Sequence, residues 1–388
     1  MNDPEIYELA NKVLGGLTND LMEGTYAGLR GNLSLFWGSE EIYNACASSK
    51  GPSNEPPNHT ITVNDELVRQ VWRDAECCCE FLRSISEGST TDEFYEFWDS
   101  RAKLPPCSDD EKLVHNMFVA AITWVYFHEL GHLNQEHGVI RDEFGPKRDK
   151  AKRTTDIHEF EISRDKLISG KEALVSHVTE LAADFEATNF YVLELIRHLL
   201  NPSFVDEKDR LEVFYDTLYL MVCGISLVFF RFNGDNPILP TAVVEGSHPK
   251  PLARLELLVI QITEILNILG PEIIGNVDGR TVNMLCKKAT FSAALYWSTT
   301  NTENHDLDDG FILKGVHSSP CFLQYLQKII NTWDEVLPRI KQVNRFENPL
   351  GFMGFLNEFR KRATSVPPWG SAPEAKATTS SPPDAATS

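Results

Sequence analysis

The eight cysteines of this 388-residue chain contain no CxxC pair and no evenly spaced framework. Without such spacings, the sequence indicates neither a zinc ribbon nor the disulfide scaffold of a small secreted domain. Cys77, Cys78 and Cys79 are consecutive in a stretch of helical character, so at most one of them can point to any given face. We expect free thiols that pack as small apolar groups, which fits a reducing cytosol.

Two signals for leaving the cytosol are also missing. Residues 1–16 carry acidic side chains and lack the basic segment followed by an apolar run that marks a secretory signal. The most apolar segment, Thr217–Phe230, is shorter than the ~20 residues that a bilayer requires. We therefore expect it to be a buried core helix, and we expect a cytoplasmic protein that is not bound to a membrane.

Positive charge is scarce, since 36 Lys and Arg stand against 56 Asp and Glu, for a formal net charge of −20. Such a chain repels nucleic acid and anionic lipid. Its one short basic run, residues 145–153, is flanked by acidic residues, so we expect no nucleic-acid partner. Neither a glycine-rich P-loop nor a GxSxG elbow occurs, which excludes two common classes of enzyme.

Helical periodicity dominates what is present. Hydrophobic residues make up 42% and charged residues 24% of the chain, as in a globular protein. We predict a mainly α fold, or α+β with a few short strands, one at 60–65 and an edge strand in 156–163. The expected helices cover approximately 66–85, 110–137, 171–200, 208–231, 251–269, 280–298, 320–341 and 351–363, with Asp109 or Asp110 capping the second and Gly138 ending it.

Composition divides the chain into four segments. Residues 1–54 are expected to be helical and then irregular, with a loop at Ser48–His59, and 55–270 to form the core. A C-terminal helical region, 271–364, should pack on that core. The tail 365–388, rich in Pro, Ala, Ser and Thr, should be disordered, and the mixed charges of 139–170 are typical of a solvated loop.

The motif that carries chemistry is His-Glu-x-x-His, at residues 128–132. On a helix, His128 and His132 project from one face and can reach one metal ion. Glu129 is displaced around the helix, where its carboxylate could take a proton from a water molecule attacking a carbonyl. The neighbouring residues are apolar or small, which predicts a buried helix whose His and Glu side chains need partners.

A catalytic zinc site needs a third protein ligand. The continuation HExxHxxGxxH does not supply it, because Gln135 and Gly138 occupy the positions of the glycine and the third histidine. His137 is one residue early, and we interpret it as a surface or capping histidine near the end of the helix.

A second helix offers the ligand in the stretch 177–190. Glu180 and Asp184 are one turn apart, and small residues (Ala182, Ala183 and Ala187) would let this helix pack closely against the first. Glu180 would complete a His2Glu site, and Asp184 could accept a hydrogen bond from a zinc-binding histidine. His177 is a rival ligand, and Glu172 and Glu186 rank below it.

A third stretch, 245–258, places His248 and Pro249 just before a helix and Arg254 in its first turns. His248 could donate a hydrogen bond to the oxyanion of a tetrahedral intermediate. Arg254 could hold the substrate backbone or brace the acids of the site. By composition alone, a loop histidine and a surface arginine are the favoured interpretations.

Three motifs follow one another along the chain: HELGH, ELAADFEA and H-P-x-x-x-x-R. Their order resembles that in gluzincin metallopeptidases whose third ligand comes from an ExxAD-type helix. The HtpX-like and CAAX-prenyl-protease-like enzymes share this pattern but are embedded in membranes. Among soluble relatives the chain looks more like the Lit-type phage-exclusion peptidases of bacteria. The resemblance covers roughly residues 55–265.

The resemblance implies a zincin-like core and a zinc endopeptidase. His128, His132 and Glu180 would be the Zn²⁺ ligands, Glu129 the base and Asp184 the support behind a ligand, while His248 and Arg254 would assist the transition state. For the Lit group it further implies a cytosolic protease that attacks a translation factor during phage infection. The alternative function is a non-catalytic zinc-containing module that binds a protein partner.

Overall fold

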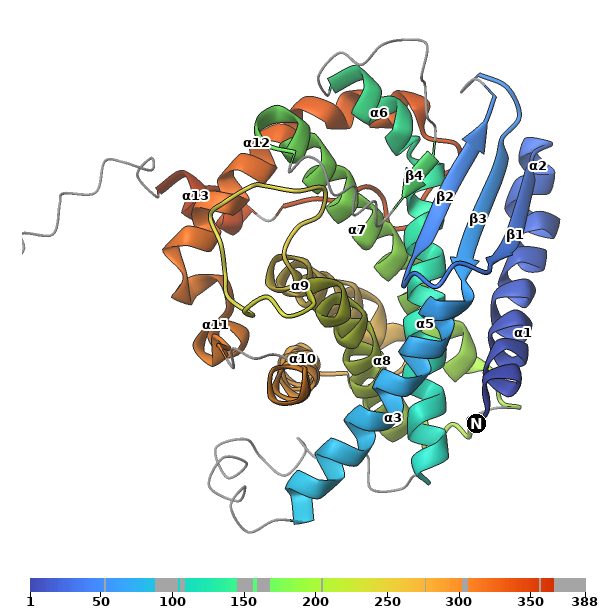
Figure 1. Cartoon of the computed structure of the whole chain (residues 1–388), viewed down its shortest axis with the longest axis vertical. Coiled ribbons are helices and arrows are strands. Elements are labelled where there is room, and N and C mark those ends of the chain that lie inside the picture. The colour runs from blue at the N-terminus through green and yellow to red at the C-terminus, as the bar shows by residue number, and fades with distance from the viewer. Residues whose placement is uncertain are drawn as a thin grey trace, which may run out of the picture.

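The computed structural model describes residues 1–51, 54–87, 104, 109–144, 156–158, 168–203, 205–275, 277–301, 306–355 and 357–365. Over these residues the fold is mainly helical with one small sheet, as the sequence predicts (Figure 1). The longer helices are α1 Asp3–Leu21, α3 Asp65–Glu87, α5 Asp110–Asn134, α6 His137–Phe144, α7 Gly170–Leu200, α8 Arg210–Asn233, α9 Pro251–Ile273, α10 Gly279–Thr300, α12 Pro320–Val343 and α13 Asn357–Ser365. Shorter pieces are a π-helical turn at Met22–Tyr26, α2 Ala27–Leu29, α11 Asp309–Lys314 and a 3-10 turn at Gly315–Ser318.

The sheet has the order β1-β3-β2-β4, where β1 is Asn32–Gly38, β2 Ala45–Lys50, β3 Asn58–Asn64 and β4 Asp156–His158. β3 pairs in parallel with β1 and antiparallel with β2, and β4 forms the edge beyond β2. β3 was expected, and so was a strand beginning at Asp156.

The irregular structure expected before residue 54 is wrong for β1 and β2, and the loop expected at Ser48–His59 is too long at both ends, because β2 runs to Lys50 and β3 begins at Asn58. β2 has the sequence ACASSK, whose small residues have little intrinsic strand preference. Its pairing with β3 on one side and β4 on the other holds it as a strand. β4 lies far away in sequence, so local composition gave no sign of that pairing.

Helix α5 is the centre of the molecule and is flanked by α3, α7, α8 and the sheet (Figure 1). Asp109 caps it, since its side chain accepts a hydrogen bond from the Glu111 backbone N–H. Its residues from Ala120 to Asn134 are all buried, because neighbouring elements surround it on every side. A helix that is apolar all round is a core helix, as the residues flanking the motif predicted.

Small residues bring α5 and α7 together. A Cβ atom added at Gly131 would lie 3.2 Å from the Ala183 Cα and carbonyl oxygen, so glycine permits this approach. Ala182, Ala183 and Ala187 are fully buried, as expected for residues at a close helix contact. The backbones are therefore near enough for side chains of both helices to meet.

The predicted end of α5 is wrong by three residues. α5 ends at Asn134, Glu136 adopts a positive φ of 50°, and α6 begins at His137. The C-terminal segment holds this reversal, because the Arg345 backbone N–H donates to the Asn134 carbonyl (2.9 Å) and the Arg345 side chain pairs with Glu136. A contact across two hundred residues, and not Gly138, decides where the helix stops.

Helix α8 is long and apolar enough, by length and composition, to cross a membrane, and 78% of its most apolar window is buried inside the structure. It packs against α5 and α10, and Gly224 allows it to approach the Met117 carbonyl. The expectation of a buried core helix at Thr217–Phe230 agrees with this packing.

One cluster of buried apolar residues runs from Ile6 to Ala363, so residues of the first three predicted segments share a core. The boundaries drawn at 54 and 270 stay predictions. No disulfide joins the seven described cysteines, and Cys78, Cys79, Cys223 and Cys286 are buried, as expected. The tail 366–388 and most of the charged run 145–167 lie outside the described residues.

Candidate metal centre

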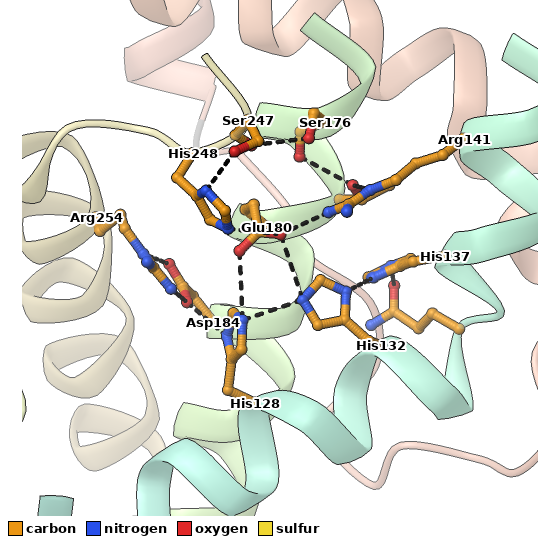
Figure 2. A network of polar contacts seen from close by, with 12 residues as sticks. His128, His132, His137, Arg141, Ser176, Glu180, Asp184, Ser247, His248 and Arg254 are labelled. Carbon is orange, nitrogen blue, oxygen red and sulfur yellow. Dashed lines mark hydrogen bonds and ion pairs between the residues drawn. The ribbon is translucent and has the colours of Figure 1, made fainter. Parts of the chain in front are cut away.

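His128, His132 and Glu180 come together in the core, where α5 faces α7 (Figure 2). The two imidazole Nε2 atoms are 3.0 Å apart. The Glu180 carboxylate oxygens lie 3.4 Å from the Nε2 atoms, Oε2 from His128 and Oε1 from His132. All three side chains are buried. Within the described part of the chain, this is the one group of three His, Cys, Asp or Glu residues that could hold a metal ion.

The tautomer of His128 follows from Asp184. The Asp184 Oδ1 atom lies 2.8 Å from His128 Nδ1. Burial by itself raises the pKa of Asp184, but the Arg254 guanidinium outweighs burial and holds that pKa below its usual value. An ionised carboxylate only accepts hydrogen bonds, so His128 Nδ1 carries the hydrogen and Nε2 presents a lone pair to the centre.

The tautomer of His132 follows from a second histidine. His132 Nδ1 lies 2.8 Å from His137 Nδ1, and His137 Nε2 lies 3.3 Å from Gln135 Oε1. The amide oxygen accepts, so His137 carries its hydrogen on Nε2 and accepts at Nδ1. His132 then donates from Nδ1, and its Nε2 also presents a lone pair to the centre.

Two lone pairs and a carboxylate therefore face one another with no hydrogen left between them. Burial lowers the pKa of His132 to about 4, so a proton does not fill the gap at neutral pH. A cation could fill it, because ligand atoms about 2.0–2.1 Å from a tetrahedral zinc ion are about 3.3 Å apart. The measured separations of 3.0, 3.4 and 3.4 Å match that spacing. The residues fit a metal ion of this size.

Arg141, on α6, completes the surroundings of Glu180. Its guanidinium NH2 group donates to Glu180 Oε1 (2.5 Å) and its Nε to Thr179 Oγ1 (2.8 Å). Burial raises the pKa of Glu180, but the positive charge that His248 and His132 carry at low pH outweighs burial and holds that pKa well below its usual range. Glu180 is therefore ionised, as a metal ligand must be.

Glu129 is fully buried on α5, next in the chain to His128. The sequence assigned it the role of base; the structure shows that it is buried on the helix that carries His128 and His132, and the role itself stays a prediction. Its burial beside His128 is consistent with a carboxylate that serves the centre and not the solvent-exposed surface.

Arg254, on α9, does not point into the centre. Its Nε and NH2 groups donate to Asp184 Oδ2 (2.8 Å) and Oδ1 (2.6 Å), and its guanidinium lies 4.2 Å from the centre of the Phe229 ring. The favoured interpretation of a surface arginine is wrong, because the residue is 3% exposed. Of the two roles considered for Arg254 at the site, bracing the acids is the one that these contacts support.

Replacing Arg254 by alanine should destabilise the protein by about 3–5 kcal/mol, because it leaves Asp184 charged and buried without its partner. The matched control is Arg360→Ala, which breaks the exposed pair with Asp334 and should cost about 0–1 kcal/mol. Urea unfolding of the two variants beside wild type measures both values. Equal destabilisation would show that the buried pair contributes no more to the free energy of unfolding than the exposed pair.

His248 lies on the other side of Glu180 from Arg141 (Figure 2). Its Nε2 is 3.6 Å from Glu180 Oε1, and its Nδ1 is 2.7 Å from the Ser247 hydroxyl. The Ser176 hydroxyl donates to the Ser247 carbonyl (2.7 Å), which ties this loop to α7. Burial lowers the pKa of His248 to about 3, so its imidazole is neutral at neutral pH.

The rival ligands lie elsewhere. His177 Nδ1 is 3.2 Å from the Tyr325 hydroxyl, on the side of α7 that faces α12. Glu186 accepts hydrogen bonds from Asn134 and Gln135. Glu172 is half-buried in the first turn of α7 and is not part of the group of three. Glu180 is the carboxylate that the structure brings to the two histidines.

The interpretation of His137 as a surface or capping histidine is wrong, since it is 0% exposed and contacts His132. The contacts of Arg141 and Gln135 at the centre were not predicted. His137 and Arg141 are four residues apart, so helical spacing predicts one shared face. That signal was hidden because the segment after residue 138 was assigned to a solvated loop.

No protein-family model, no curated protein and no solved structure matches the chain. The assignment of a function therefore depends on the geometry of the site and on the motifs themselves.

Proposed function

We propose that this protein is a zinc-dependent endopeptidase of the gluzincin type that hydrolyses peptide bonds of an intracellular protein. The observation that carries the proposal is the convergence of two histidine lone pairs and an ionised glutamate within 3.0–3.4 Å, beside a glutamate at the second position of HExxH. Nitrogen ligands favour zinc over magnesium or calcium, which prefer oxygen.

Each residue has a stated role in this proposal. His128, His132 and Glu180 hold the ion, which when bound lowers the pKa of water to about 7 and polarises a carbonyl. Glu129 accepts the proton of the attacking water and passes it to the leaving amine. A structural zinc site has no need of a glutamate at that position, which is the reason to favour catalysis.

His248 and Arg254 would assist the reaction in different ways, the first directly and the second through Asp184. His248 is neutral, so it can donate from Nε2 to a developing oxyanion when the Ser247 hydroxyl donates to its Nδ1. Arg254 acts through Asp184, which orients His128. A zincin-like core and a role in phage defence rest on the resemblance to the Lit-type peptidases.

The second candidate is a non-catalytic module that keeps the metal and binds a protein partner. One observation favours it: His128, Glu129, His132 and Glu180 are each at most 1% exposed, so the centre is enclosed. A peptide would reach it only after the surrounding segments move. His248 and Arg141 are the partly exposed residues at its border, with side-chain exposures of 15% and 23%.

Metal content and cleavage of host proteins separate the two candidates. Purified wild-type protein should contain about one zinc per chain by mass spectrometry. Incubated with a bacterial lysate, it should generate new peptide termini that disappear when a chelator is added. One zinc per chain without any cleavage would favour the binding module. No bound metal after incubation with zinc would overturn both.

A further inference from the structure

We propose that His137 is a positioning residue for His132, which fixes the ring tautomer that presents His132 Nε2 to the metal. The inference depends on the proposed metal site but not on peptidase activity. His137 is outside the HExxH motif and lies on a different helix, α6. Its effect is exerted through His132, and it does not itself reach Glu180 or His128 in the structure.

The contact between the two rings is buried and direct. The Nδ1 atoms lie 2.8 Å apart, the ring centres are 4.9 Å apart, and the rings are nearly perpendicular at 79°. An Nδ1–Nδ1 hydrogen bond needs one donor and one acceptor, so the tautomers of the two rings are opposite. Whatever sets the tautomer of His137 therefore also sets that of His132.

The tautomer of His137 is set by the side chain of Gln135, two residues earlier in the chain. Gln135 Oε1 lies 3.3 Å from His137 Nε2, and the amide nitrogen of Gln135 donates to Glu186. The same nitrogen donates to the Ala182 backbone carbonyl (3.4 Å), which can only accept, so the Gln135 amide cannot reverse without losing that bond. The orientation passes from Glu186 to Gln135, then to His137, and finally to His132.

The fold supports this chain of contacts at the reversal between α5 and α6. Glu136 takes its positive φ between Gln135 and His137, where the Gln135 side chain contacts both His137 and Glu186 of α7. The pairing of Arg345 with Glu136 holds the reversal. His137 therefore serves His132 as Asp184 serves His128, with a neutral imidazole in place of a carboxylate (Figure 2).

The direct test is the tautomer in metal-free protein. Nitrogen-15 chemical shifts of the imidazoles should show His132 protonated on Nδ1 in wild type, assigned by the signals lost in His132→Gln. His132 protonated on Nε2 would overturn the proposal. This measurement needs neither bound metal nor activity, so it remains decisive if the proposed function fails.

The second test is zinc affinity, measured by competition with a chromophoric chelator. His137→Ala should weaken zinc binding about 10–100-fold, as for other partners of metal-binding histidines. His137→Asn keeps an acceptor near the place of Nδ1 and should restore affinity to within about threefold of wild type. His198→Ala, at an exposed histidine on α7, is the matched control and should bind like wild type.

The outcomes separate the two claims. Wild-type affinity in a folded His137→Ala would overturn the positioning role while leaving the metal site intact. Loss of affinity in both the Ala and Asn variants, with near-ultraviolet circular dichroism unchanged, would also overturn it, because the rescue depends on the acceptor. No zinc in wild type would overturn the proposed function, and the nitrogen-15 shifts would then decide the inference alone.

Discussion

Glu129→Gln should retain about one zinc per chain, and its cleavage rate should be about 10²–10⁴-fold lower than that of wild type. Glutamine keeps the size of the side chain but cannot accept the proton of the attacking water. Because Glu129 is not one of the three converging ligands, the metal content should not change. The cleavage rate on the substrate protein, measured beside the zinc content of the same preparation, checks both parts.

The matched control for this variant is Glu111→Gln, in the exposed first turn of the same helix. It makes the same chemical change on α5 and should cleave at the wild-type rate. Cleavage by Glu129→Gln at the wild-type rate would refute the assignment of the base. A variant that loses both zinc and activity would instead show that Glu129 is needed to hold the metal.

Glu180→Ala should abolish stoichiometric zinc binding, which is the second large effect. It removes the only carboxylate of the group of three, and the loss should exceed the 10–100-fold cost of removing a supporting partner. Zinc titration followed by thermal unfolding measures it. At free zinc 1,000 times its dissociation constant, wild type should gain about 4 kcal/mol of stability, while Glu180→Ala should gain none.

Two variants on the same helix control for this experiment. Glu172→Ala removes a half-buried glutamate from α7, and His177→Ala removes the rival ligand that contacts Tyr325. Both should keep one zinc per chain. Loss of zinc in His177→Ala with retention in Glu180→Ala would reverse the ligand assignment and would contradict the distances in the structure.

Local periodicity predicts much of the site. His128 and His132 are four residues apart, as are Glu180 and Asp184, so each pair lies on one face of its helix. This follows from helix geometry alone and does not depend on how the helices pack. The small residues of α7 predicted the close contact with α5, and the structure has that contact at Gly131. The helices α7 to α10 were likewise predicted to within a few residues.

Residues whose role depends on distant partners were not predicted. His137 was predicted to be a surface or capping histidine because it lies near the end of the expected helix. It is buried because Arg345 pairs with Glu136 and turns the chain at that point. Strand β2 was missed because its pairing residues, and not its own composition, make it a strand.

The sequence by itself determined that this is a mainly helical protein with two histidines and two carboxylates on helices able to face one another, because helical spacing and apolar patterning are local properties. Only the tertiary structure decided which carboxylate meets the histidines, and that His137, Arg141 and Arg254 surround them. Hydrogen-bond direction and charge pairing depend on atoms brought within about 3 Å across the fold, and no local pattern encodes those distances.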